Sequence, residues 1–112
     1  MSGGSGRYDD LFQSFGRIQI WRMFGGEGVF AGPVMIGPVM RDQLFLRTDD
    51  VTRPRYLAEK SVPFSFAKGG RTITTAYYSV PDRLLDDAYA FADWARDAQR
   101  VALAHKAKEK KR

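Results

Sequence analysis

Cysteine is absent from the 112 residues, and histidine occurs once, as His105. The chain therefore has no disulfide, no thiolate nucleophile, and too few ligands for a zinc site. No run reaches the roughly 18 to 20 apolar residues that cross a membrane, and residues 1–6 lack the charged and apolar regions of a secretory signal. We expect a cytoplasmic protein that holds no metal and no cofactor.

A catalytic constellation is also missing from the sequence. Carboxylates stand in adjacent pairs at residues 9–10, 49–50 and 86–87, each where a helix is expected to begin. At such positions they cap the helix and complement its dipole. General acid and base catalysis needs carboxylates that converge in a cleft, which this spacing does not indicate. The sequence predicts a protein that is not an enzyme.

The excess of positive charge is not spread evenly along the chain. The 18 lysines and arginines against 13 acidic residues give a net charge of +5, of which residues 105–112 carry +4 and residues 1–104 only +1. The cations of this tail are Lys106, Lys108, Lys110, Lys111 and Arg112. They either complete a solvated helix end or bind nucleic acid without sequence preference, through counterion release.

The chain has the length of one domain. Residues 1–6 are glycine and serine after the initial methionine, a composition typical of a flexible leader. We expect disorder in this leader, one folded domain over residues 7–105, and a basic tail over residues 106–112.

The first half of the domain predicts a short helix followed by a meander of strands. Residues 8–15 carry apolar side chains at helical spacing. Residues 17–24 alternate with period two, which places Ile18 and Ile20 on one face and Trp21 on the other. Strands are also expected at 28–31, 34–40 and 43–47, and Pro38 must lie at a bulge or an edge because proline cannot donate to a ladder.

The second half predicts a helix, a hairpin and a long helix. A helix over residues 51–60 contains Pro54 near its first turn. Residues 64–78 read as a hairpin around Gly69 and Gly70, with Tyr77 and Tyr78 on opposite faces. After Pro81, apolar residues at spacings of three and four predict the long C-terminal helix.

This order of elements indicates an α+β domain of two layers, with about five mostly antiparallel strands and about three helices. The helices suffice to cover one face of the sheet. If the strands alternate regularly, the uncovered face carries Trp21, Met23, Met35, Val39 and Phe45. An apolar face without a cover favours self-association, so we predict a homodimer through these residues.

The segment Arg22-Met23-Phe24-Gly25-Gly26-Glu27-Gly28 breaks an apolar strand with three glycines. Such a segment forms either a hairpin turn or a nest of N–H groups that binds an anion or a small molecule. In the second case Gly25, Gly26 and Gly28 present the amides and Arg22 supplies the cation. No helix follows at once, as it does in a phosphate loop, so the hairpin is favoured and the anion site stays as the alternative.

A linear series of motifs runs through most of the chain. The glycine segment is followed by Leu44-Phe45-Leu46-Arg47 with Asp49, Pro63-Phe64-Ser65-Phe66, Tyr77-Tyr78-Ser79-Val80-Pro81, Leu84-Leu85-Asp86-Asp87 and Trp94-Ala95. In order and spacing this series resembles the N-terminal domain of the TfoX/Sxy competence regulators. The resemblance covers roughly residues 11–104.

The resemblance implies a small α+β fold with a helix-flanked antiparallel sheet. It also implies a role in regulation, since the best-known members promote expression of natural-competence genes in bacteria together with a cyclic-AMP receptor protein. Those members carry a second, C-terminal domain, and this chain is similar to the stand-alone members. The function expected from it is a non-enzymatic regulatory or protein-interaction module, with a protein partner in transcription regulation.

Overall fold

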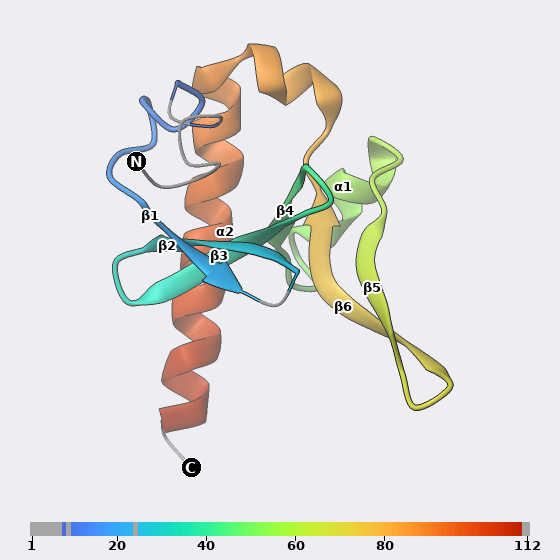
Figure 1. Ribbon diagram of the computed structural model, residues 1–112. Coiled ribbons are helices and arrows are strands. Elements are labelled where there is room, and N and C mark those ends of the chain that lie inside the picture. The colour runs from blue at the N-terminus through green and yellow to red at the C-terminus, as the bar shows by residue number, and fades with distance from the viewer. Residues whose placement is uncertain (1–7, 9, 24, 111–112) are drawn as a thin grey trace.

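The computed structural model of the protein describes residues 8, 10–23 and 25–110, and side chains as far as residue 108. One antiparallel sheet of six strands lies against a long helix (Figure 1). The strands are β1 (Gln19–Met23), β2 (Gly26–Ala31), β3 (Val34–Met40), β4 (Gln43–Arg47), β5 (Pro63–Lys68) and β6 (Arg71–Ser79). The helices are α1 (Arg53–Ala58), the short 3₁₀ helix η2 (Asp82–Asp86) and α2 (Ala88–Lys110). The predicted α+β class is confirmed.

The strand order in the sheet is β1-β2-β3-β4-β6-β5. The first four strands form the predicted meander, and the β5–β6 hairpin joins it because β6 pairs with β4. The hairpin leans away from the plane of β1–β3 (Figure 1). As a result, the meander and the hairpin form two walls with β4 between them.

Helix α2 covers one face of the sheet by packing across β3 and β4. Its apolar stripe, predicted from the three- and four-residue spacing, includes Phe91, Ala95 and Ala98, all with no exposed surface. Opposite them Ile36 and Leu46 are equally inaccessible. The core therefore lies between α2 and one face, and the other face has no helix over it in the described part of the chain (Figure 1).

In place of the expected helix at residues 8–15, residues 10–15 form a succession of turns. The amides of Phe12 and Gly16 donate to the carbonyls of Tyr8 and Phe12 at 3.1 and 2.9 Å, which is too little pairing for a regular helix. So short a segment gains little from helix propagation. Packing holds it instead, since the Phe12 ring meets Phe91 edge-on at 4.9 Å between centroids.

A bulge in β3 corrects the predicted alternation. Val29 pairs with Gly37 but Phe30 pairs with Met35, so Ile36 is an extra residue. The bulge reverses the side-chain parity of the strand beyond it. Val39 consequently lies in the core cluster and not on the uncovered face, so its predicted placement was wrong.

Pro38 follows this bulge in an interior strand. The pairing of β3 with β4 includes only Val39 and Met40, so no amide of Pro38 is needed on that side, while on the other side Pro38 pairs in register with Gly28. At Gly37 a Cβ atom would collide with the carbonyl oxygen of Phe45, which requires glycine there. The prediction that Pro38 lies at a bulge or an edge was therefore wrong for the residue itself, since the bulge is at Ile36, two residues before it, and β3 lies between β2 and β4.

The helix starts use the carboxylates as predicted for two of the three pairs. Asp49 Oδ1 accepts from the amides of Val51 and Thr52 at 3.0 and 2.8 Å, ahead of α1, and Asp87 Oδ1 accepts from the amide of Ala90 at 3.1 Å in the first turn of α2. Residue 9 of the third pair lies outside the described residues.

The two predicted termini are described only in part. Helix α2 runs on to Lys110, so the first residues of the expected basic tail are helical, while Lys111, Arg112 and the leader 1–6 lie outside the described residues. No helix in the described part of the chain has the length and apolar character to span a membrane.

Candidate functional site

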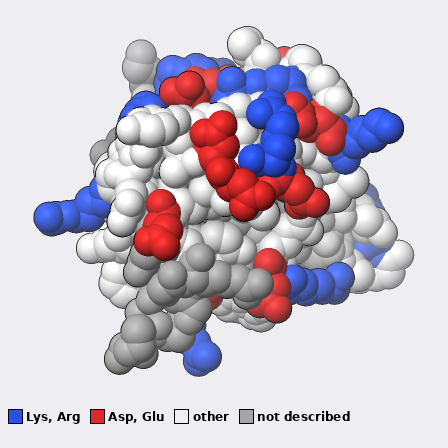
Figure 2. All heavy atoms as spheres, turned by 90° about the horizontal axis from the view of Figure 1, so that it is seen from above, with Lys and Arg blue, Asp and Glu red and all other residues white. Residues whose placement is uncertain are grey.

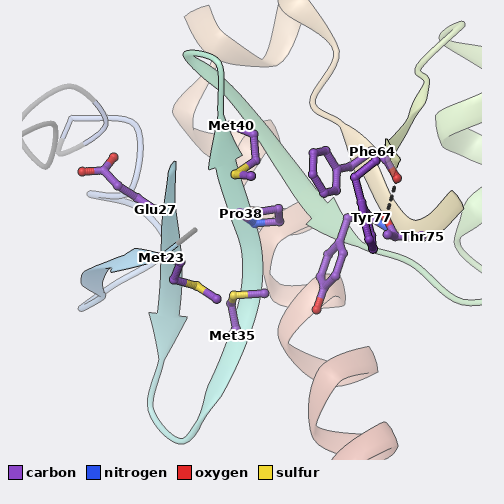
Figure 3. A pocket seen from close by; sticks show the side chains of 9 residues that line it. Met23, Glu27, Met35, Pro38, Met40, Phe64, Thr75 and Tyr77 are labelled. Atoms are coloured by element: carbon purple, nitrogen blue, oxygen red, sulfur yellow. Dashed lines mark hydrogen bonds between the residues drawn. The ribbon is translucent and has the colours of Figure 1, made fainter. Parts of the chain in front are cut away.

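The face of the sheet opposite α2 contains an apolar groove of about 380 Å³ (Figure 3). This volume falls in the range of small-ligand pockets, roughly 300 to 1,000 Å³. The residues that line the apolar groove are Met23, Glu27, Met35, Pro38, Met40, Phe64, Phe66, Thr75 and Tyr77. They come from β1–β3 on one side and from β5–β6 on the other.

The two walls of the groove differ in character. The meander supplies three methionines, whose unbranched thioethers adapt to irregular shapes. The hairpin supplies aromatic rings, with Phe64 and Phe66 stacked at 6.0 Å between centroids. Between the walls Phe45 meets Phe64 at 5.5 Å and is covered by it. The floor and both sides of the groove are therefore apolar.

Two glycines of the fingerprint segment make room for this groove. A side chain at Gly28 would run into the sulfur atoms of Met23 and Met35, and one at Gly26 would run into that of Met40. The sequence predicted a turn at these glycines, with an anion site as the alternative, and not this packing. Of the three glycines in the segment, only Gly25 has the positive φ, 67°, that a turn demands of glycine.

The two hydroxyl groups at the groove already form hydrogen bonds within the protein. The Thr75 hydroxyl donates to the carbonyl of Phe64 at 2.8 Å, as the dashed line in Figure 3 marks. The Tyr77 hydroxyl accepts a long bond of 3.5 Å from Arg47 NH1. The Glu27 carboxylate points away from the methionines (Figure 3). A ligand in the groove would meet chiefly apolar surface.

The structure separates the residues that were predicted for the uncovered face. Trp21 and Met23 are 57% and 40% exposed on β1. Met35 faces the groove beside Met23, and Phe45 is buried beneath Phe64. With Val39 in the core, only Trp21 and Met23 of the five offer substantial surface to a partner.

A wider hollow of about 650 Å³ lies at the glycine turn and includes Arg22, Gly25 and Gly26. Its charged side chains are two arginines, Arg22 and Arg41, and two acids, Glu27 and Asp42. The charges balance, and Gly25 leads into strand β2 and not into a helix, so the features of a phosphate loop are missing at this turn. Anion contact through Arg22, Gly25, Gly26 and Gly28 stays a prediction.

Beside the apolar groove, the C-terminal part of α2 helps to form a smaller cavity of about 190 Å³. His105 and Lys106 reach it from the helix, Arg47 from the end of β4, and it shares Met35 and Tyr77 with the groove. Arg47 was absent from the predicted sites. The signal that could have found it is its position two residues after Phe45, on the same face of β4.

The basic tail is described as far as its first two lysines. Lys106 and Lys108 are exposed on α2. The side chain of Lys110, and residues 111–112, lie outside the described residues. Contact of this tail with nucleic acid stays a prediction.

Cations and carboxylates elsewhere on the molecule form pairs. Arg83 holds Glu59 through Nε and NH2, the shortest bond being 2.6 Å, and these hydrogen bonds lower the pKa of the Glu59 carboxyl. The Arg55 guanidinium lies over the Trp94 ring, 4.0 Å from its centroid. Seen from above, blue and red side chains interleave (Figure 2). This end of the molecule has the character of a solvated, salt-bridged surface.

Tyr56 is a buried polar group away from the groove. It packs against Trp94 at 4.7 Å between centroids, and its hydroxyl has no hydrogen-bond partner among the described residues. Burial raises the pKa of this phenol, so it stays protonated. Its place in the core cluster makes it a structural residue. Over the described range no three His, Cys, Asp or Glu residues gather as metal ligands.

Comparison with known families gives a match that spans nearly the whole described body. The model of the TfoX N-terminal domain matches residues 10–102. This range agrees with the 11–104 covered by the sequence resemblance. No protein of curated function matches the chain.

Proposed function

We propose that the chain, which belongs to the TfoX N-terminal domain family, is a non-enzymatic regulatory module. It acts by binding protein, and its first partner is a second copy of itself. The observation that carries this proposal is Trp21, 57% exposed in the middle of the end strand β1. An exposed tryptophan on an end strand is a typical interface anchor.

The second copy pairs with β1 in antiparallel fashion about a twofold axis. Trp21 is the third of the five residues Gln19–Met23, so this pairing sets the two Trp21 side chains opposite each other on the open face. Gln19 then faces Met23 of the other copy, and Ile20 faces Arg22. No like charges meet in this register.

The other end strand, β5, is protected against such pairing. It begins at Pro63, which cannot donate a hydrogen bond, has a register shift between Pro63 and Ser65, and ends at Lys68. Proline, irregular pairing and terminal lysine are devices by which proteins blunt sheet edges. Strand β1 has none of them, which favours β1 as the interface.

Sedimentation velocity tests this proposal. Wild-type protein should sediment as a dimer at high concentration, and Trp21→Glu should shift it to monomer because a charge would be buried at the twofold axis. Phe66→Glu is the matched control, since Phe66 is 41% exposed on the protected strand β5. A wild-type monomer at millimolar concentration would rule the dimer out.

A further partner in transcription regulation is supported by the family alone. Such a protein would bind the dimer. When each protein is cross-linked to its partners in the native host, the Trp21→Glu variant should therefore recover less of this partner than the wild type does. Equal recovery by both proteins would separate partner binding from dimer formation.

A further inference from the structure

A charged end adjoins the apolar groove. The groove and the smaller cavity share Met35 and Tyr77, so they adjoin each other, with the methionines in the groove and Arg47 and Lys106 in the cavity. Figure 3 shows the Tyr77 ring reaching from the groove with its hydroxyl directed away from Phe64. One ligand can therefore meet apolar surface along most of its length and cations at one end.

Arg47 is held in place by Tyr77, but not all of its N–H groups have a hydrogen-bond acceptor in the described part of the chain. Its guanidinium carbon lies 5.3 Å from the centroid of the Tyr77 ring, and NH1 donates to the Tyr77 hydroxyl at 3.5 Å. Nε is buried and has no acceptor among the described residues. A buried N–H without an acceptor is unfavourable. A carboxylate offers the two oxygens that a guanidinium fork accommodates.

The side chains of the apolar groove determine the chemical character of the rest of the ligand. Its methionines, Met23, Met35 and Met40, adapt to a flexible chain, and the Thr75 hydroxyl is already used by Phe64. A second negative charge on the ligand would be left in this groove without a partner, at considerable cost. The fitting molecule has one anionic end and an apolar body.

We propose that the groove binds an amphipathic monocarboxylate, with its chain among the methionines and phenylalanines and its carboxylate on Arg47, next to Lys106. The binding site is formed by side chains from β1–β3, β5 and β6, with Arg47 at the end of β4 and Lys106 on α2. It goes beyond the proposed dimer, which depends on the outer edge of β1 and shares only Met23 with the groove.

Isothermal titration with decanoate, decanol and decyltrimethylammonium, each below its aggregation limit, tests the site. Decanoate should bind more tightly than the neutral and the cationic probe. Arg47→Gln should weaken decanoate by about tenfold or more and leave decanol unchanged, because only the charged contact is lost. Arg96→Gln is the control, since Arg96 donates to Asp93 and to the Ser14 carbonyl, away from the groove. Equal affinity for all three probes would overturn the proposal.

A second measurement uses the wild-type protein and so does not depend on the folding of a variant. With methyl-labelled methionine, decanoate should shift the NMR signals of Met23, Met35 and Met40. The Trp21→Glu variant should show the same shifts of Met35 and Met40, which lie on β3, whether or not the wild type forms dimers. The absence of these shifts at millimolar decanoate would refute the site.

Discussion

The two faces of the sheet are built from different side chains. Under α2 the strands present branched aliphatic residues such as Ile36 and Leu46, which have no exposed surface. On the other face they present methionine and phenylalanine, with Met23 and Phe66 exposed by 40% and 41%. Branched side chains pack in few ways and specify a structure, whereas thioethers adapt. The covered face therefore determines the fold, and the open face is available for binding.

The largest expected effect is a difference between two phenylalanines. Phe91→Ala on α2 should lower the free energy of unfolding by about 3 to 5 kcal/mol, because it leaves a cavity in the core. Phe66→Ala on the open face should cost less than about 1 kcal/mol, since little buried surface is lost. Urea unfolding measures both variants. Equal losses would mean that the open face stabilises the fold as much as the covered one.

Two glycine substitutions sharpen the comparison at a smaller scale. Gly37→Ala should cost about 3 kcal/mol, because the new methyl group meets the Phe45 backbone, which cannot move aside. Gly28→Ala should cost about 1 kcal/mol, because Met23 and Met35 can rotate away. Thermal and urea unfolding check the order. The Gly28 variant should also bind decanoate less well, since the displaced methionines enter the groove.

The smallest expected effect concerns the carboxylate cap of Asp49, which lies just ahead of α1. Hydrogen bonds from the Thr52 amide, then from its hydroxyl and the Val51 amide, lower the pKa of Asp49. A lowered carboxyl pKa adds stability above its unfolded value of about 3.9, which is lost as the pH falls through the folded value. Asp49→Ala should cost about 1 kcal/mol at neutral pH and less in acid.

Asp49→Asn supplies the control for this cap. Asparagine caps helices about as well as aspartate but does not titrate. The variant should therefore unfold with a weaker dependence on acid and with near wild-type stability at neutral pH. A loss for Asp49→Ala that stays constant from neutral pH to acid would show that the charge of the carboxylate contributes nothing.

Much of the covered face could be predicted from the sequence, because the spacing of apolar residues indicates which side chains are buried. The stripe of α2, with Phe91, Ala95 and Ala98, follows from spacings of three and four. The strand Gln19–Met23 follows from alternation, which placed Ile20 inward and Trp21 outward as observed. The order of the elements followed from the same patterns, and the family motifs agreed with it.

The open face could be predicted only in part, since it depends on contacts between strands distant in the sequence. Alternation alone misplaced Val39, because a bulge leaves no clear mark in a single sequence. The packing of Met40 on Gly26 requires the pairing register of β2 with β3. Arg47 became a candidate only when α2 and β6 were seen beside it.

The extra residue Ile36 divides β3 into two segments of opposite phase. Met35 on one side of it and Met40 on the other both reach the groove, although they are five positions apart and regular alternation would place them on opposite faces. Removing that one residue would restore a uniform alternation and turn either Met35 or Met40 toward α2. Apart from Gly37, length more than chemical identity is therefore what this part of the chain must preserve: homologues should exchange the other side chains here but rarely gain or lose a residue.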